Sequence, residues 1–387
     1  MHAYLDPVKM ITNRFKGGMM AQTADKLCLE GAEVVYLTAK GSKEPDRAND
    51  ADAKGMTPPN RIKLVYHDGL HDYMEKVLEL APKMDAVVLG AAVANLIPVT
   101  PFKEKFPSHN YKPGDIIPID FTIAPRVIDQ VKDVMKPTAH LFGFKLLAGQ
   151  PHEELISAAY GVLLESRASC VFANDPTVRD GFGGLATKYA VTKERGVHKM
   201  NLDDVPAFIL TMLEDEYYST ISVKTTGCKG GVQESWDHVD KLIQKHQDKF
   251  TEVEGGLVFG TVAVRVCDKN YPNAFVTTAR GKRELEGRVL VLSVDHDTQI
   301  VTTLGDCAVP GTTKATLNAP LLHWIFSQYP KVDSIVHTHD FDPDFPTYRY
   351  APPGTKRDSV RGLPCKSFNV EGHGVYVLLN DKGEAIW

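Results

Sequence analysis

Hydrophobic and polar positions in the first half of the chain follow two alternating patterns. Apolar residues recur every three or four positions in segments typical of amphipathic helices, at 18–29, 70–80, 153–166 and 205–217. Continuous apolar runs separate these segments and predict buried strands at 32–37, 62–66, 85–94, 139–144 and 170–173. The alternation predicts an α/β fold, with a doubly wound, mostly parallel, Rossmann-like sheet covered by helices on both faces.

The pattern of apolar and polar residues changes in the second half of the chain. A charged segment at 234–250 carries Trp236, Val239 and Leu242 on one helical stripe. A further helix is expected at 319–328, among short β-type runs at 257–266, 274–278, 289–294, 300–304, 334–337 and 374–379. Residues 220–231 look like a linker or an edge segment. We therefore predict a first domain at 1–220, a linker at 221–233 and a second α/β domain at 234–387.

The composition of the chain argues against several classes of function. A chain of 387 residues favours two or three domains. Its net charge of -5 argues against binding to nucleic acid or to an anionic membrane. The sequence has no apolar run long enough for a membrane span and no signal peptide at its start. Its six scattered cysteines form no CxxC pair and predict reduced thiols in a cytoplasmic protein.

Three short segments of the first half carry candidate chemistry. The Gly17-Gly18 turn after Asn13 opens a helix, and helix N-termini suit phosphate or carboxylate groups, although many such turns bind nothing. Ala91–Asn95 ends an apolar strand with small residues, which either admit a ligand at the carboxyl edge of the sheet or allow close helix packing. Lys103 and Lys105 taken alone predict only solvated loop charges.

Taken together, these segments resemble a known family. Residues 5–20 (LDPVKMITNRFKGGMM) resemble the opening motif of bacterial phosphopantothenoylcysteine synthetase, where Ile-Asp-x-Val-Arg precedes an Ile-Ser/Thr-Asn pair and Ser-Ser-Gly-x-Met-Gly. Residues 91–105 resemble its Ala-Ala-Val-Ala-Asp segment and the lysine ten residues later. Residues 143–147 and 173–184 resemble its Gly-Phe and Ala-Asn-Asp...Gly-Phe-Gly segments. The resemblance covers about residues 5–215.

The resemblance implies a ligase that uses CTP or ATP with Mg²⁺ to activate a carboxylate and then forms an amide with cysteine or a related amine. The resemblance also implies a role for each residue of this chain that matches a motif of the family. Asn13 would hold the acyl-nucleotide intermediate, and Lys105 would neutralise the phosphates. The implied nucleotide- and substrate-binding positions are Gly17, Ala91, Ala92, Asn95, Phe144 and Asn174. Asn95 replaces the family's Asp, and the family's first strand with its Gly-Gly-Thr turn has no counterpart before the opening motif.

Histidines form a second candidate site in the second half. His337 and His339 lie two residues apart at the end of an apolar run, so on a strand both rings would face the same side. His373 precedes another predicted strand and could add a third imidazole. Three histidines with an open fourth position make up the ligand set of a catalytic Zn²⁺ site. The alternative is an ordinary His-x-His pair in a chain with 14 histidines.

The part of the chain that contains these histidines, about residues 234–379, also resembles a known family. The His337-Thr338-His339 segment with His373 downstream is similar to the class II aldolase/adducin domain. This similarity implies Zn²⁺ or another divalent transition metal bound by the three histidines. Thr261 and Ala263 stand where that family has polar phosphate contacts. Asn318 stands where its aldolases have a proton-transferring Glu, and an amide cannot take up that proton.

We favour a ligase in the first domain fused to a diverged zinc-binding aldolase-like domain. The alternative is a metal-dependent lyase, epimerase or dehydratase acting on a phosphosugar-like substrate, with the first domain as a nucleotide-binding or scaffold module. In a third hypothesis, the second domain is a non-catalytic scaffold. Small-molecule substrates and a homo-oligomer are expected, because both families commonly complete their sites with a neighbouring subunit.

Overall fold

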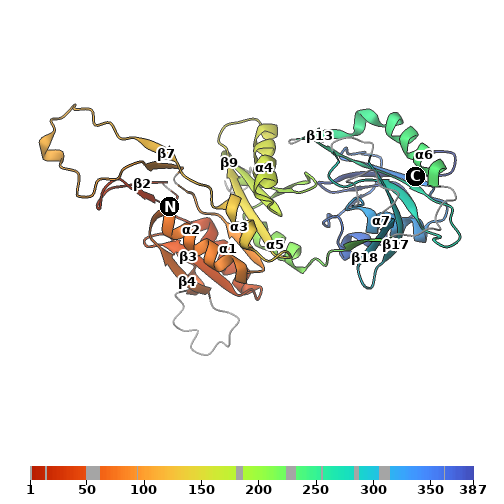
Figure 1. The fold of residues 1–387 in the computed structure, drawn as a ribbon, viewed down its shortest axis with the longest axis horizontal. Helices are drawn as coiled ribbons and strands as arrows, with labels where there is room; N and C mark the ends of the chain where they lie inside the picture. Colours follow the sequence, from red (N-terminus) through yellow and green to blue (C-terminus); the bar gives the residue numbers. More distant parts are fainter. Residues whose placement is uncertain are drawn as a thin grey trace. The chain divides into compact units, whose positions relative to one another are not determined.

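The computed structural model describes residues 2–13, 15–48, 62–93, 95–179, 186–223, 232–253, 256–282, 287–304, 314–360 and 362–387. The chain forms two compact units (Figure 1). The first unit comprises residues 1–193 and 199–213, and the second comprises residues 194–198 and 214–387. No helix in the described ranges is long and apolar enough to cross a membrane. Each unit is described by itself.

A five-stranded sheet forms the centre of the first unit, in the order β11-β10-β9-β8-β5. Its strands are β5 (Ala86–Leu89), β8 (His140–Leu146), β9 (Cys170–Arg179), β10 (Ala186–Thr192) and β11 (Val197–Met200). Strands β5, β8 and β9 pair in parallel, and β10 runs antiparallel to β9. A separate parallel pair joins β3 (Val34–Ala39) to β4 (Ile62–His67). The α/β fold class predicted from the sequence is confirmed.

Five α-helices accompany these strands: α1 (Gly18–Leu29), α2 (Gly69–Leu80), α3 (Ile128–Val134), α4 (His152–Ser166) and α5 (Asp204–Glu214). Neighbouring residues of β10 show how two of them are placed. Tyr189 packs against His152 of α4, whereas Ala190 belongs to the apolar cluster that contains α5. Because successive strand residues point to opposite faces, α4 and α5 cover opposite sides of the sheet.

Two short antiparallel pairs were not predicted from the sequence. Strand β1 (His2–Tyr4) pairs with β2 (Met10–Thr12), and β6 (Leu96–Pro98) pairs with β7 (Phe121–Ile123). Each strand has three residues, which is too short for an alternating pattern to stand out. The predicted strand at 85–94 is also shorter than expected, since β5 ends at Leu89 and small residues follow it.

The second unit contains a nine-stranded sheet in the order β12-β18-β17-β16-β15-β19-β22-β21-β20. All neighbours pair antiparallel except β12 with β18 and β20 with β21. The strands are β12 (Ser219–Val223), β15 (Thr261–Arg265), β16 (Phe275–Thr278), β17 (Arg288–Asp295), β18 (Ile300–Leu304), β19 (Ser334–Thr338), β20 (Thr347–Tyr348), β21 (Phe368–Val370) and β22 (Gly374–Leu379).

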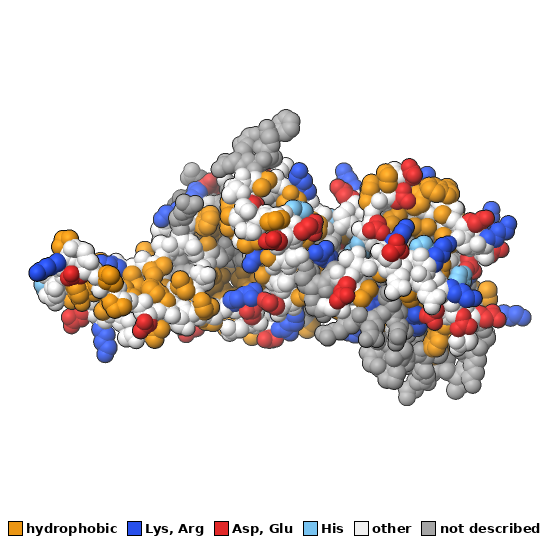
Figure 2. All heavy atoms as spheres, turned by 90° about the horizontal axis from the view of Figure 1, so that it is seen from above, with side chains coloured by type: hydrophobic (Ala, Val, Ile, Leu, Met, Phe, Trp, Pro, Cys, Tyr) orange, Lys and Arg blue, Asp and Glu red, His pale blue; other side chains and the backbone are white. Residues whose placement is uncertain are grey.

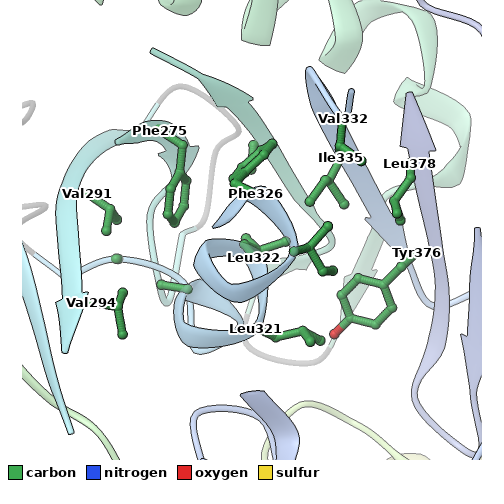
Figure 3. Close-up of a cluster of buried hydrophobic side chains, with 14 of the residues drawn as sticks. Phe275, Val291, Val294, Leu321, Leu322, Phe326, Val332, Ile335, Tyr376 and Leu378 are labelled. Atoms are coloured by element: carbon green, nitrogen blue, oxygen red, sulfur yellow. The ribbon is translucent and has the colours of Figure 1, made fainter. Parts of the chain in front are cut away.

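Helices cover both faces of this sheet. On β15, Val262 and Val264 pack toward α6 (Val232–Lys245), while Ala263 belongs to the cluster around α7 (Ala319–Gln328). Figure 3 shows Leu321, Leu322 and Phe326 of α7 surrounded by strand side chains. The remaining described elements are the short pair β13 (Thr251–Val253) and β14 (Leu257–Phe259), the helix α8 (Lys356–Ser359) and four 3₁₀ turns.

Two boundaries differ from the sequence prediction. Residues 220–231 were expected to be a linker or an edge segment, and β12 at their start is an edge strand of the second sheet, which agrees with the second alternative. The predicted linker at 221–233 also overlaps the start of α6 at Val232. Residues 224–231 lie outside the described ranges. The predicted strand at 257–266 is two strands, broken at Gly260. Its φ of +116° suits only glycine, and a side chain there would meet the Phe250 ring at 2.2 Å.

Candidate functional site

Two candidate residues of the first unit are joined by a hydrogen bond. Asn13 follows β2, and its side-chain amide donates to the carbonyl oxygen of Ala92 at 3.0 Å. Ala92 follows β5, so the bond ties the opening motif to the carboxyl end of a parallel strand. Gly17 then caps α1 with a φ of +82°. The opening motif, the small-residue segment and a helix N-terminus therefore meet where open α/β sheets bind ligands.

Close packing also explains the small residues after β5. A side chain at Gly90 would lie 2.1 Å from the sulfur of Met20 in α1. The alternative interpretation of this segment, close helix packing, therefore applies at Gly90. Ala91 is exposed and Ala92 is partly exposed, which leaves their surfaces available to a ligand.

Lys105 is positioned by a residue that the sequence analysis did not single out. The buried carboxylate of Asp6 accepts hydrogen bonds from the backbone N–H groups of Val8 (2.7 Å), Lys9 (2.6 Å) and Phe106 (3.0 Å). The same loop is held again where Phe102 N–H donates to the Leu5 carbonyl at 2.8 Å. These bonds hold the pKa of Asp6 well below its usual range, the largest contribution coming from Phe106. Asp6 stands in the quoted Leu-Asp-Pro segment, so its place in the opening motif was the available signal.

The structure does not join every candidate residue of this unit. Lys105 is exposed, and the described hydrogen bonds and ion pairs do not link its side chain to Asn13 or Ala92. Asn95 is also exposed, and its carbonyl accepts the N–H of Ala124 at 2.9 Å beside the β6–β7 pair. These two residues lie on the segment that leaves the sheet, outside the contacts made by Asn13.

Phe144 and Asn174 lie on neighbouring parallel strands. The Phe144 ring packs on Phe172 of β9 at 5.1 Å, and Asn174 stands opposite Leu146 of β8. The next residue, Asp175, accepts hydrogen bonds from Gly149 N–H at 2.8 Å and Thr177 N–H at 2.7 Å, which ties the loop after β8 to β9. The similar Gly-Phe-Gly segment at 181–183 lies outside the described residues.

The structure brings the three candidate histidines of the second unit together. One ring nitrogen from each of His337, His339 and His373 lies within 4.8 Å of the others, close enough to hold a metal ion. His337 and His339 are at the end of β19, and His373 directly precedes β22, the strand paired with β19. His337 and His373 are buried, while His339 is partly exposed.

The environment of His337 suits a metal ligand. Its Nδ1 lies 2.9 Å from the carbonyl oxygen of Val375, so in the neutral ring Nδ1 carries the proton and Nε2 carries the lone pair. Nε2 is buried and has no hydrogen-bond partner within the part of the chain that the structure describes. Burial lowers the pKa of His337 to about 4 and holds the pKa of His339 well below its usual range. Both rings are therefore neutral at pH 7, the form that binds metals.

Gly374 allows the two histidine segments to approach closely. It has a φ of +131°, and a Cβ atom there would lie 2.1 Å from the Thr338 carbonyl oxygen and 2.7 Å from the His339 Cα atom. Only glycine fits this contact. The Tyr376 ring, two residues later, stacks on His337 at 4.1 Å. The backbone thus fixes the spacing of the three imidazoles before any metal binds.

A chain of hydrogen bonds connects Asn318 with the histidine strand. The Asn318 N–H donates to Thr316 Oγ1 at 3.3 Å, and Thr316 Oγ1 lies 3.1 Å from Thr261 Oγ1. Thr261 pairs with His337 across β15 and β19. Among the described residues, the side-chain oxygen of Asn318 is buried and finds no hydrogen-bond donor. An unpaired buried amide oxygen is uncommon and marks this position as a place where a ligand group could donate.

Comparisons with known proteins find relatives for the first part of the chain. Residues 1–214 match the family model of the DNA/pantothenate metabolism flavoprotein C-terminal domain. The chain is 31% identical over 172 residues to the Coenzyme A biosynthesis bifunctional protein CoaBC of Thermococcus kodakarensis, which is 44% of this chain and 38% of that protein. The chain spans less than half the length of the curated relatives it matches.

Two solved structures are similar to separate parts of the chain. The DNA/Pantothenate Metabolism Flavoprotein from Streptococcus pneumoniae aligns with 54% of this chain and 93% of its own, with 20% identity and a TM-score of 0.45. An aldolase II superfamily protein from Pseudomonas syringae aligns with 39% of this chain and 71% of its own, with 13% identity and a TM-score of 0.28.

Proposed function

We propose that this chain, which belongs to the family of the DNA/pantothenate metabolism flavoprotein C-terminal domain, is a phosphopantothenate–cysteine ligase. The substrate carboxylate would attack the α-phosphorus of CTP or ATP and release pyrophosphate. The cysteine amine would then displace the nucleoside monophosphate and form the amide. The observation that carries this proposal is the hydrogen bond from Asn13 to the carbonyl of Ala92, which joins two segments of candidate site residues at the carboxyl end of β5.

Six of the candidate residues have a part in this reaction. Asn13, fixed against Ala92, would orient the acyl-nucleotide. The Gly17 turn would face the phosphates with backbone N–H groups. Lys105 would offset charge on the departing pyrophosphate. Ala91 and Ala92 would admit the pantothenate chain. A Mg²⁺ ion bound with the triphosphate would supply further charge neutralisation. Asn95, unlike the family's Asp, offers that ion a neutral oxygen.

The test is release of pyrophosphate from CTP or ATP by the full chain, with 4'-phosphopantothenate and cysteine present. Omitting cysteine should leave the acyl-nucleotide bound and stop turnover after one equivalent. A full chain that binds neither nucleotide at millimolar concentration contradicts the ligase assignment.

Lys105→Ala should weaken nucleotide binding by about 1.5–3 kcal/mol, the range for a hydrogen bond assisted by charge. Lys103→Ala is the matched control, because Lys103 is exposed on the same loop. Isothermal titration calorimetry with CTP and ATP measures both variants. Equal affinities for the two variants would remove Lys105 from the phosphate site.

For the second unit, we propose that one divalent transition metal ion binds to His337, His339 and His373. Zn²⁺ is the first candidate for this ion. The observation that favours it is the convergence of three ring nitrogens within 4.8 Å. Imidazole ligands select this class of metal, and three of them leave a position for a ligand oxygen. A bound ion would act as a Lewis acid on that oxygen. Metal analysis of chelator-free protein tests the site, and less than a tenth of an equivalent, not restored by Zn²⁺, Mn²⁺ or Co²⁺, would contradict it.

Asn318 predicts weak aldolase chemistry. Its amide cannot take up a proton, so the chain should cleave simple phosphosugars such as fuculose 1-phosphate little or not at all. Asn318→Glu should raise any such cleavage, because a carboxylate would then stand at the buried end of the Thr261–Thr316 hydrogen bonds. A coupled assay for the aldehyde product compares it with Asn318→Gln. Equal rates in both variants would argue against a proton-transfer role for this position.

We also propose that the chain is a homo-oligomer through the first unit. Large apolar side chains stand exposed along the segment from β6 to β7, including Leu96 (45% exposed), Ile116 (91%) and Ile123 (71%). Figure 2 shows hydrophobic side chains, in orange, gathered on the surface at the left of the view. Monomeric proteins rarely expose so many large apolar residues together. Sedimentation equilibrium tests the assembly, with Ile116→Asp and Ile123→Asp expected to weaken it.

A further inference from the structure

Four polar side chains of the second unit, outside both candidate sites, form one continuous chain of hydrogen bonds. The Tyr218 hydroxyl lies 2.6 Å from Nδ1 of His296 and 2.9 Å from Oγ of Ser359. The other nitrogen of the same imidazole, Nε2, lies 3.4 Å from Nδ1 of His323. His323 and Ser359 are buried, and the other two side chains are partly exposed. Neither proposed reaction uses these groups.

The hydrogen-bond chain connects four separate elements. Tyr218 directly precedes β12, and His296 lies in the turn between β17 and β18. His323 is on α7, and Ser359 is the last residue of α8, which packs on α7. The four side chains therefore fasten two short segments of the unit, the one before β12 and α8, to a helix of its core.

Two backbone hydrogen bonds pair the segment before β12 with the segment that contains α8. Tyr218 N–H donates to the Gly354 carbonyl, and Lys356 N–H donates to the Glu216 carbonyl, both at 2.9 Å. Helix α8 has only four residues, too few for a helix that is stable by itself. The two segments are thus held in place by their contacts with the rest of the unit, and the hydrogen-bond chain is one of these contacts.

The direction of each hydrogen bond follows from Ser359. Its hydroxyl has one proton and donates it to the Lys356 carbonyl at 3.0 Å, so its oxygen accepts from Tyr218. The Tyr218 oxygen then accepts from Nδ1–H of His296, whose Nε2 carries the lone pair. That lone pair accepts from Nδ1–H of His323. Both imidazoles are neutral in this arrangement.

Burial keeps both imidazoles neutral at pH 7. It is the largest of the causes that lower the pKa of His296, and together with neighbouring charges it lowers the pKa of His323 to about 4. Charged groups from each neighbouring element face the chain without reversing this effect. They are Asp295 and Asp297 at the β17–β18 turn, Lys356 and Asp358 of α8, and Arg265 of β15.

Protons disrupt this arrangement in acid. Protonated His296 would donate from both nitrogens, so its Nε2–H would meet Nδ1–H of His323 unless that proton moves to the far nitrogen of the second ring. A second proton removes the last lone pair between the rings and leaves two cations face to face, which is costly in a buried place. In an open state, where both rings meet water, each takes up a proton near about pH 6.5.

We propose that these four side chains form an acid-sensitive latch, which holds α8 and the segment before β12 against α7 at neutral pH and releases them in acid while the sheet stays folded. Because the pKa of His323 is lower in the closed state, the latch has its full stability above about pH 6.5 and loses it as the pH falls toward about 4. The latch is independent of both proposed reactions.

Amide hydrogen exchange of the full chain, followed by NMR, tests the latch through the N–H groups of Tyr218, Ser219 and Lys356. Their protection factors should fall at least about tenfold from pH 7 to pH 5, because the open state takes up protons that the closed state excludes. The N–H groups of Val264 and Val276, in the buried strands β15 and β16, should lose less than about threefold over the same range.

A double variant separates the latch from ordinary packing. In His296→Gln with His323→Gln, the side chains still form hydrogen bonds but take up no proton, so the loss of protection between pH 7 and pH 5 should disappear. Tyr218→Phe keeps the ring and breaks the chain, so protection should already be lower at pH 7. His238→Gln is the control, because His238 is partly exposed on α6, and it should behave as the wild type.

Three outcomes would overturn the proposal. Equal losses of protection in the latch and in the core strands would mean that acid unfolds the whole unit. Wild-type protection that does not fall between pH 7 and pH 5 would exclude release, and a fall that persists in the double variant would assign it to other groups. Ring ¹⁵N shifts check the bond directions, and a proton on Nε2 of His296 at pH 7 contradicts them.

Discussion

Gly374→Ala is expected to destabilise the second unit by at least about 3 kcal/mol, the combined scale of backbone strain and overpacking, and to abolish zinc binding. The added Cβ atom would lie 2.1 Å from the carbonyl oxygen of Thr338 and 2.7 Å from the Cα atom of His339. Both neighbours are backbone atoms and cannot rotate away. Relief requires that β22 move from β19, which separates His373 from the other two histidines.

Gly383→Ala is the matched control for this change. Gly383 also has a positive φ, +73°, but a Cβ atom there would meet nothing within 4 Å. It should therefore cost only the conformational strain, roughly 1 kcal/mol, and leave zinc binding intact. Denaturant unfolding and zinc titration measure both variants. Similar losses of stability in the two proteins would show that close approach at Gly374 does not set the geometry of the cluster.

Asp6→Ala is expected to weaken nucleotide binding at least as strongly as Lys105→Ala and to lower the unfolding temperature as well. The carboxylate of Asp6 is the shared acceptor for Val8, Lys9 and Phe106, so its loss releases the loop that carries Lys105. Asp115→Ala is the control, because Asp115 is exposed and accepts the N–H of nearby Lys112. Calorimetry with CTP or ATP compares them, and normal affinity in Asp6→Ala would mean that this anchor does not position Lys105.

The same anchor predicts a pH dependence of stability. Because the pKa of Asp6 is lowered in the folded chain, its contribution is complete above the unfolded value, about 3.9, and is lost as pH falls toward the folded value. The difference in unfolding temperature between wild type and Asp6→Ala should thus stay constant from pH 8 to 5 and shrink below about pH 4. A difference that grows on acidification would contradict the assignment of this carboxylate as the acceptor.

The local pattern of apolar residues was sufficient to predict the helices and strands that bury one continuous face. Helices α1 and α7 and strand β18 have the predicted bounds, because their apolar spacing and flanking residues agree with their burial. Short strands such as β1 and β6 could not be predicted this way. Their three residues carry no period. What fixes them is pairing, of β1 with the nearby β2 and of β6 with β7 across a long loop, and the carboxylate of Asp6 also holds that loop.

The candidate sites show the same difference between what local sequence predicts and what depends on the fold. The sequence singled out His337 and His339 through their spacing, and strand geometry alone puts them on one face. Only the fold shows that His373 reaches them, because the close contact at Gly374 depends on the pairing of β19 with β22. Likewise Asn13 and Ala92 were separate candidates in the sequence, and the fold joins them by a hydrogen bond.

The sequence by itself determined the alternation of helices and strands, the family of the first unit and the residue types at both candidate sites, since these depend on local spacing and chemistry. Tertiary structure decided which residues stand beside one another. The sequence places Asp6 in the opening motif but does not predict that it is buried, because an aspartate in a loop is usually a solvated surface charge. Its burial and its hydrogen bond from Phe106 N–H come from a chain segment 100 residues away. Such distant contacts have no local signal, and only the packed chain creates them.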